Sequence, residues 1–220
     1  MTTLQRLANA NRLAAVTFAA AALIFCATTA QAAPQVATSV TVETGNSFIG
    51  PLYATVGGRR RKVADQAIRA WLIEGGRKIA YSTPDGAGGF ENEGNGLYVY
   101  DVRSSRRRKV MSEYFAVTDL KEARTRAGRT ALLVTMGDGG LGASYFAVVN
   151  PLRGEVFFRR WARLTGHNGD QISVGIWTDE GVWENAAEDG TPKSPPARTE
   201  RHNLATLLRR RVIYNRPSNR

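Results

Sequence analysis

The segment GLYVYDVRSSRRRKV (Gly96–Val110) ends in five letters, RRRKV, that also end the earlier segment GPLYATVGGRRRKV (Gly50–Val63). In both segments an apolar run rich in β-branched and aromatic residues leads into a short turn and then into the basic run. This order predicts a β-hairpin in each place. The spacing from Leu52 or Leu97 to the first arginine differs between the copies by an even number of residues. Equivalent side chains should therefore face the same side of the sheet in both hairpins.

Further copies of this pattern follow along the chain. A third, weaker hairpin is predicted at SYFAVVNPLRGEV (Ser144–Val156), and the hairpins recur about every 45 to 48 residues. Two other strand–turn–strand units lie between them, at Ala67–Thr83 and at Phe115–Thr135, and a last partial copy is predicted at Asp170–Trp183. A repeat of about 44 residues with four strands in each copy is typical of β-propeller blades.

The first full repeat, Ala67–Val110, resembles a blade of the TolB-like or WD-repeat-like β-propellers. Gly76–Tyr81 stands where that family has a glycine, a basic residue and a strand, and Gly96–Val102 matches its later LYVYD strand. The resemblance covers two blades well and two half-blades poorly, and the chain has Glu74-Gly75 where the family often has Asp.

The repeats predict an all-β fold of antiparallel four-stranded units that form a partial or small β-propeller-like structure, with a β-sandwich as the alternative. A closed ring usually takes four to eight blades, and this chain has room for four at most. One way to complete a blade would be to pair the hairpin in Ser47–Val63 with the strands in Asp170–Trp183.

The first 32 residues have the pattern of a secretory signal peptide. Arg6 and Arg12 precede an apolar run of roughly 13 residues, and Ala30-Gln31-Ala32 follows, so we expect cleavage after Ala32 and export to the periplasm or the medium. The run is too short for a transmembrane span. A lipoprotein acylated at Cys26 is disfavoured because Phe25 precedes it. Cys26 is the only cysteine, so the mature chain would have no disulfide or thiol chemistry.

We expect four divisions of the chain: 1–32, the signal peptide; 33–183, the repeat domain; 184–200, a proline-containing loop or linker; and 201–220, a C-terminal helix or strand with a frayed tail. Asn203 is a candidate helix cap. The net charge is +11. A charge of this sign favours polyanionic partners without indicating a fold.

The two arginine runs are predicted to be outermost strands, where basic side chains discourage edge-to-edge pairing. Alternatively they bind an anionic surface, such as phosphate-bearing lipid or an anionic polysaccharide. Nucleic acid is disfavoured because neither run is interleaved with the aromatic residues that stack on bases. The candidate polyanion-binding residues are Arg59, Arg60, Arg61, Arg106, Arg107 and Arg108.

Polar residues gather in two glycine-rich loops, Thr83–Gly96 and Met136–Ser144, which should emerge on one face. They are the candidate ligand-binding residues Asp85, Glu91, Glu93, Asn95 and Asp138. Asp85, Glu91 and Glu93 could supply oxygen ligands to calcium, although the twelve-residue calcium-loop pattern is lacking. No other metal or cofactor is expected.

A hydrolase or lyase would depend on the two residues His167 and Asp170, which we expect on a loop, with Ser144 as a nucleophile. No nucleophile-elbow motif surrounds Ser144. We therefore expect a non-enzymatic, exported binding protein that presents its loop face to an envelope protein or a glycan. TolB-like proteins bind protein partners in the bacterial periplasm, which is what the resemblance implies. The alternatives are the exported hydrolase or lyase and a self-assembling structural protein that completes its ring as a homodimer.

Overall fold

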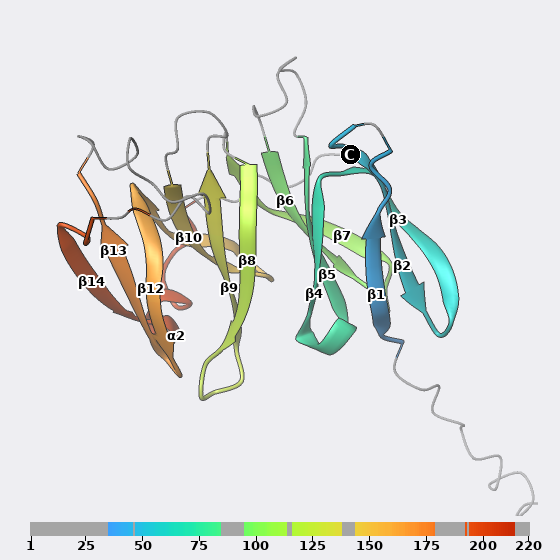
Figure 1. The fold of residues 1–220 in the computed structure, drawn as a ribbon. Coiled ribbons are helices and arrows are strands. Elements are labelled where there is room, and N and C mark those ends of the chain that lie inside the picture. Colours follow the sequence, from blue (N-terminus) through green and yellow to red (C-terminus); the bar gives the residue numbers. More distant parts are fainter. Residues whose placement is uncertain are drawn as a thin grey trace, which may run out of the picture. The chain divides into compact units, whose positions relative to one another are not determined.

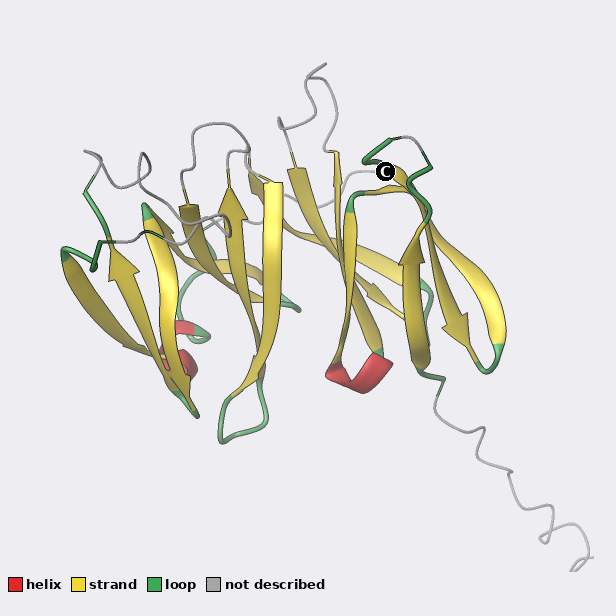
Figure 2. Cartoon of the chain, viewed as in Figure 1, coloured by secondary structure: helices red, strands yellow, loops and turns green. Residues whose placement is uncertain are grey.

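A computed structural model describes residues 35–45, 47–84, 95–113, 116–137, 144–178, 192 and 194–213. The chain divides into two units, 1–34 and 35–220, and every described residue belongs to the second unit. Within these residues the fold is all-β, with antiparallel sheets that follow one another in chain order (Figure 1, Figure 2).

Each sheet is a meander in which every strand pairs with its neighbour in the chain. The first sheet contains β1 (Ala37–Val42), β2 (Gly50–Val56) and β3 (Arg59–Ala67). The second contains β4 (Arg69–Ile73), β5 (Lys78–Pro84), β6 (Asn95–Asp101) and β7 (Arg106–Glu113). The third contains β8 (Ala116–Arg124), β9 (Thr130–Gly137), β10 (Ser144–Asn150) and β11 (Gly154–Arg160). The fourth contains β12 (Ala162–Asn168), β13 (Gln171–Ile176) and β14 (Arg198–Asn203). The 3₁₀ turn η1 (Glu74–Gly76) joins β4 to β5, and the short helix α2 (Leu204–Leu207) follows β14.

The predicted hairpins and their outermost basic strands are confirmed. Both RRRKV runs begin edge strands, β3 in the first sheet and β7 in the second. The leucines that open the two hairpins, Leu52 and Leu97, are both completely buried. The even difference in spacing therefore does keep equivalent side chains on the core side of each sheet.

Among the described residues, three apolar cores hold the sheets together, one between each pair of consecutive sheets. Leu52 and Tyr81 lie in the core between the first and second sheets. Leu97 and Val134 lie in the core between the second and third, and Phe146 and α2 belong to the core between the third and fourth. Stacking of successive antiparallel sheets in this way is the arrangement of propeller blades, so the described fold is propeller-like.

Polar contacts near β4, β8 and β12, which we call the inner edge strands, also connect neighbouring sheets. The guanidinium of Arg69 in β4 donates to the carbonyl of Thr118 in β8 at 2.5 Å, and the Glu74 backbone N–H donates to the Glu122 carboxylate at 2.6 Å. Between the third and fourth sheets, the Arg163 guanidinium donates to the Ser144 hydroxyl at 3.1 Å. These contacts add direct polar links between the sheets to the apolar packing.

Three sequence-based expectations differ from the structure. The composite blade is wrong, because β12 and β14 occupy both edges of β13, and β2 pairs with β1 and β3. His167 lies within strand β12 rather than on a loop. The strand β14 begins at Arg198, inside the segment expected to be a linker. Asn203 does cap α2, where its side chain accepts a hydrogen bond from the Thr206 N–H at 3.0 Å.

The outward face of the first sheet carries polar side chains where the structure describes it. On the first sheet, Thr55 alternates with core residues and its hydroxyl pairs with that of Ser39 at 3.0 Å. On the fourth sheet, the indole of Trp177 lies against Gly175, is 7% exposed and donates to the Ser194 carbonyl at 3.0 Å. The exposed large apolar side chains of the described residues lie elsewhere: Phe48, Leu72, Leu152 and Ile213.

Candidate functional site

The candidate catalytic residues do not form a catalytic arrangement. The His167 Nε2 lies 2.9 Å from the Gly169 carbonyl oxygen, and the Asp170 carboxylate accepts a hydrogen bond from the Arg126 N–H at 2.7 Å. The Ser144 hydroxyl is engaged by Arg163. Among these described residues, therefore, the histidine has no hydrogen bond to either the carboxylate or the hydroxyl that a triad would need.

The candidate ligand-binding and calcium-binding residues Asp85, Glu91, Glu93 and Asp138 lie outside the described residues, and Asn95 is described only as the first residue of β6. The strands that border both loops are described. The β5–β6 ladder ends at the pair Pro84 and Asn95, and the β9–β10 ladder ends at Gly137 and Ser144. In the described ranges, no three His, Cys, Asp or Glu residues gather where they could hold a metal ion.

The arginines of the two basic strands have different environments although all six are exposed: Arg59, Arg60, Arg61, Arg106, Arg107 and Arg108. Arg60 pairs with the Glu43 carboxylate and lies over the Tyr53 ring, 3.7 Å from its centroid. Arg108 donates to the Leu152 carbonyl in the turn between β10 and β11. Arg107 lines a pocket. The structure thus assigns a structural contact to Arg60 and Arg108 and leaves Arg107 beside a space that a ligand can enter.

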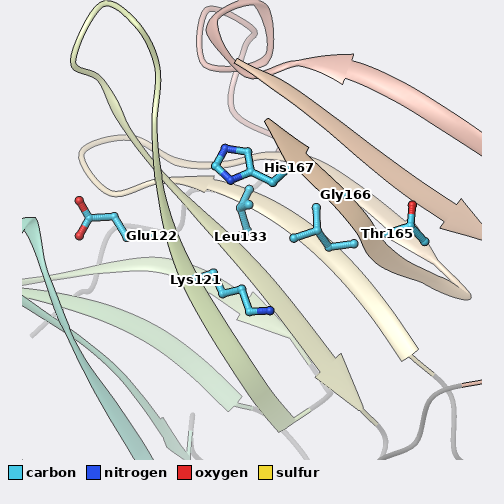
Figure 3. A pocket seen from close by; sticks show the side chains of 7 residues that line it. Lys121, Glu122, Leu133, Thr165, Gly166 and His167 are labelled. Atoms are coloured by element: carbon cyan, nitrogen blue, oxygen red, sulfur yellow. The ribbon is translucent and has the colours of Figure 1, made fainter. Parts of the chain in front are cut away.

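An open groove of about 570 Å³ separates the inner edge strands of the third and fourth sheets. Figure 3 shows the residues that line it, which come from β8, β9 and β12: Lys121, Glu122, Leu133, Leu164, Thr165, Gly166 and His167. A second hollow of about 350 Å³ shares Lys121, Leu133 and Leu164 and extends the groove along β8. Sequence reasoning selected only His167 from this groove.

The carboxylate of the groove, Glu122, points away from His167 (Figure 3). It accepts hydrogen bonds from the Glu74 N–H at 2.6 Å and from the Arg124 guanidinium at 2.7 Å. Glu122 therefore joins the second sheet to the third.

A smaller pocket of about 270 Å³ lies between the first and second sheets, beside both basic edge strands. Its walls come from β3, β5, β6 and β7: Ala64, Asp65, Gln66, Tyr81, Thr83, Pro84, Tyr98 and Arg107. The rings of Tyr81 and Tyr98 stack with their centroids 5.5 Å apart. Tyr81 is 1% exposed, and its hydroxyl has no hydrogen-bond partner among the described residues.

The electrostatics of this pocket follow from burial and from two basic side chains. Burial raises the pKa of the Tyr81 phenol, and the nearby Arg107 guanidinium opposes that rise through its charge and its approach to the phenol oxygen. The Lys62 ammonium, 2.7 Å from the Asp65 carboxylate, lowers the pKa of Asp65. At neutral pH the pocket therefore presents a neutral buried phenol, a carboxylate and a guanidinium.

A second polar cluster joins β11 to β14. The Glu200 carboxylate accepts hydrogen bonds from Arg159 at 3.0 Å and Arg198 at 3.2 Å, and lies 3.0 Å from the His202 Nε2. Burial opposes ionisation of Glu200, but His202 and Arg159 outweigh it and hold its pKa below the ordinary value. The His202 ring packs 4.5 Å from that of Phe157, so this cluster is part of the contact between the third and fourth sheets.

Comparison with known proteins gives one weak structural likeness. No protein-family model matches the chain, and no curated protein matches it. Among solved structures, it is similar to the β-propeller domain of the Trilobed protease from Pyrococcus furiosus, described as having an open velcro topology, with 15% identity and a TM-score of 0.43. The match covers 59% of this chain and 41% of that chain. Separately, the described residues include no helix with the length and apolar character needed to cross a membrane.

Proposed function

We propose that this protein is an exported, non-enzymatic binding protein that presents one end of its sheets to an envelope protein or a glycan. The observation that carries this proposal is the position of the two loop borders. The Pro84–Asn95 and Gly137–Ser144 pairs both close their ladders, and the strands β5 and β9 run toward the same end of the sheets (Figure 1).

The borders of these loops rest on rigid structure. Ser144 is buried and bonded to Arg163, and Met136 lies in the core between the second and third sheets. Loops that carry recognition residues on a packed scaffold are a common way to build a binding surface. The lack of a catalytic arrangement among the described candidate residues supports binding over hydrolysis.

The loop proposal is tested by replacing Glu91–Gly94 with a Gly-Ser segment of equal length. The control variant is Ala127→Ser, in the turn between β8 and β9 at the opposite end of its sheet. Each purified protein is used to capture envelope proteins and cell-wall glycans. Loss of a captured component in the loop variant alone supports the proposal, whereas equal capture by all three proteins contradicts it.

Export is tested by the intact mass of the mature protein. We expect a chain that begins at Ala33. Replacing Ala30 and Ala32 with bulky residues should block cleavage and retain the precursor. A mature protein that still carries residues 1–32 would contradict the proposed signal peptide.

A further inference from the structure

The two RRRKV strands frame one pocket. Its walls include Asp65 and Gln66 from β3, the strand that begins with the first run, and Arg107 from the second run in β7. Arg59 and Arg61 are exposed along β3 and lie on the same face as the core residues Ala54 and Val56, whereas Arg106 alternates with Arg107 and lies on the opposite face of β7. A ligand in the pocket would therefore lie beside Arg107, with the positive charges of Arg59 and Arg61 along β3.

The pocket walls present three kinds of chemistry to a ligand. Arg107 offers the planar guanidinium fork that matches a carboxylate with two parallel hydrogen bonds. Asp65, Gln66 and the Thr83 hydroxyl accept or donate hydrogen bonds to hydroxyl groups. Tyr98 offers an aromatic edge or face against which apolar C–H groups can pack. A fitting ligand must combine a carboxylate, several hydroxyls and a compact ring.

The Tyr81 hydroxyl supplies an independent indication of a ligand. It is buried without a hydrogen-bond partner among the described residues, and a buried hydroxyl left unpaired destabilises the folded protein. Tyr81 lines the same pocket as Arg107. A ligand oxygen placed beside both groups would accept hydrogen bonds from the phenol and from the guanidinium.

We propose that this Tyr81–Arg107 pocket binds a carboxylate-bearing sugar unit of an anionic polysaccharide, with Arg59 and Arg61 of β3 contacting neighbouring units of the chain. The inference rests on the proposed binding function and narrows its glycan alternative to one ligand class. In this arrangement Arg107 holds the sugar carboxylate, and Asp65 with Gln66 holds its hydroxyls.

The walls favour a sugar over a nucleic acid. One face of Tyr98 is taken by its stacking on Tyr81, and Arg60 covers one face of Tyr53, so the tyrosines near the basic strands do not offer a row of open stacking platforms. The Asp65 carboxylate accepts hydrogen bonds only, which suits the hydroxyl groups that a sugar presents beside its carboxylate.

The test measures binding of trigalacturonate to the full mature chain by calorimetry, with maltotriose as the neutral control. Arg107→Gln is compared with Arg106→Gln, which removes the same charge from the same strand but from a residue that does not line the pocket. We expect Arg107→Gln to weaken binding about tenfold, as the loss of one charge-assisted contact implies. Arg106→Gln should change it by less than about threefold, as screened surface charges do.

Tyr81→Phe supplies a readout that a purely structural role would not produce. It should weaken trigalacturonate binding several-fold without lowering the melting temperature of the free protein. Galacturonate alone and trigalacturonate distinguish a free sugar acid from a polymer, since flanking contacts form only with the trimer. Trimer binding that exceeds monomer binding, together with these variant effects, supports the proposal.

Three results would overturn it: equal losses for Arg106→Gln and Arg107→Gln, no binding of trigalacturonate, or tighter binding of a single-stranded oligonucleotide or of phosphatidylglycerol vesicles. The replacement of Glu91–Gly94 separates this proposal from the wider one. If that replacement abolishes envelope binding while Arg107→Gln has no effect, the pocket proposal fails and the loop proposal stands. If capture is insensitive to the loop, the loop proposal fails and the titration of Arg107→Gln is still decisive for the pocket.

Discussion

Tyr81→Phe should stabilise the free protein. This substitution removes one hydroxyl and leaves the ring, which stacks on Tyr98 and packs in the core between the first and second sheets. The hydroxyl is buried and has no hydrogen-bond partner among the described residues. Folding therefore strips water from this group without replacing the lost hydrogen bonds.

The size of the effect follows from that penalty. An unpaired buried polar group costs about 1–3 kcal/mol, whereas a paired hydroxyl contributes about 1 kcal/mol to stability. We expect the free energy of unfolding of Tyr81→Phe to rise by about 1 kcal/mol, which corresponds to a melting temperature about 2–4 °C higher for a domain of this size. Most tyrosine-to-phenylalanine changes at a paired hydroxyl would have the opposite sign.

The assay is thermal and urea unfolding of the mature chain without ligand, followed by circular dichroism. Tyr98→Phe serves as the control, because Tyr98 is only partly buried and its change should stay within about 0.5 kcal/mol. A melting temperature for Tyr81→Phe that is lower than that of the unmodified protein would show that the hydroxyl is paired. That result would refute the reasoning on which the ligand pocket depends.

Three other outcomes are expected. Gly76→Ala should lower the free energy of unfolding by about 2–3 kcal/mol, because a Cβ at Gly76, whose φ is +81°, would lie 2.1 Å from the Ala37 carbonyl oxygen. Gly75→Ala should lower it by only about 1–2 kcal/mol, because Gly75 has a φ of +66° but lies in open space. Equal losses for the two variants in urea unfolding would contradict this reasoning. Because its folded pKa is depressed, ionised Glu200 stabilises the fold above its ordinary pKa of 4.5, and this contribution is lost as the pH falls through the folded value. The free energy of unfolding of Glu200→Gln should therefore be about 1–2 kcal/mol lower than that of the unmodified protein at pH 7, and it should fall less on acidification. A pH dependence of stability identical to that of the unmodified protein would contradict this. Light scattering should show a monomer at low and high salt, since the outward face of the first sheet carries the polar residues Ser39, Thr55 and Arg60. A salt-independent dimer would favour a ring completed by a second chain.

Much of the fold was predictable because its signals are local. Apolar runs with period two, turn residues and the repeated RRRKV run identified the hairpins of the first three sheets. The strand β14, with the sequence RTERHN, has no such pattern and forms because Val174 on β13 and the helix α2 anchor it to the third core. Pairing between distant strands leaves no local signal either, which is why the composite blade was predicted and is wrong.

The residues of the pocket could not be grouped from the sequence either. Gln66, Tyr81, Tyr98 and Arg107 come from four strands, and only the packing of the first sheet on the second brings them together. The sequence showed no aromatic residues within either arginine run, but Tyr98 and Tyr100 lie opposite Lys109 and Arg107 across the β6–β7 ladder. The surroundings of an edge strand depend on the strand with which it pairs. The arginine runs alone therefore could not show whether they only prevent edge-to-edge pairing or also line a binding pocket.

The most direct test of the central claim is a map of chemical-shift changes in the ¹⁵N-labelled mature chain as trigalacturonate is added, read at backbone amides and at arginine side-chain N–H groups. The account predicts that the largest changes fall on Gln66, Thr83, Tyr98 and Arg107 and that they vanish in Arg107→Gln. Changes confined to the groove lined by Lys121 and His167, or spread evenly over all exposed arginines, would contradict it.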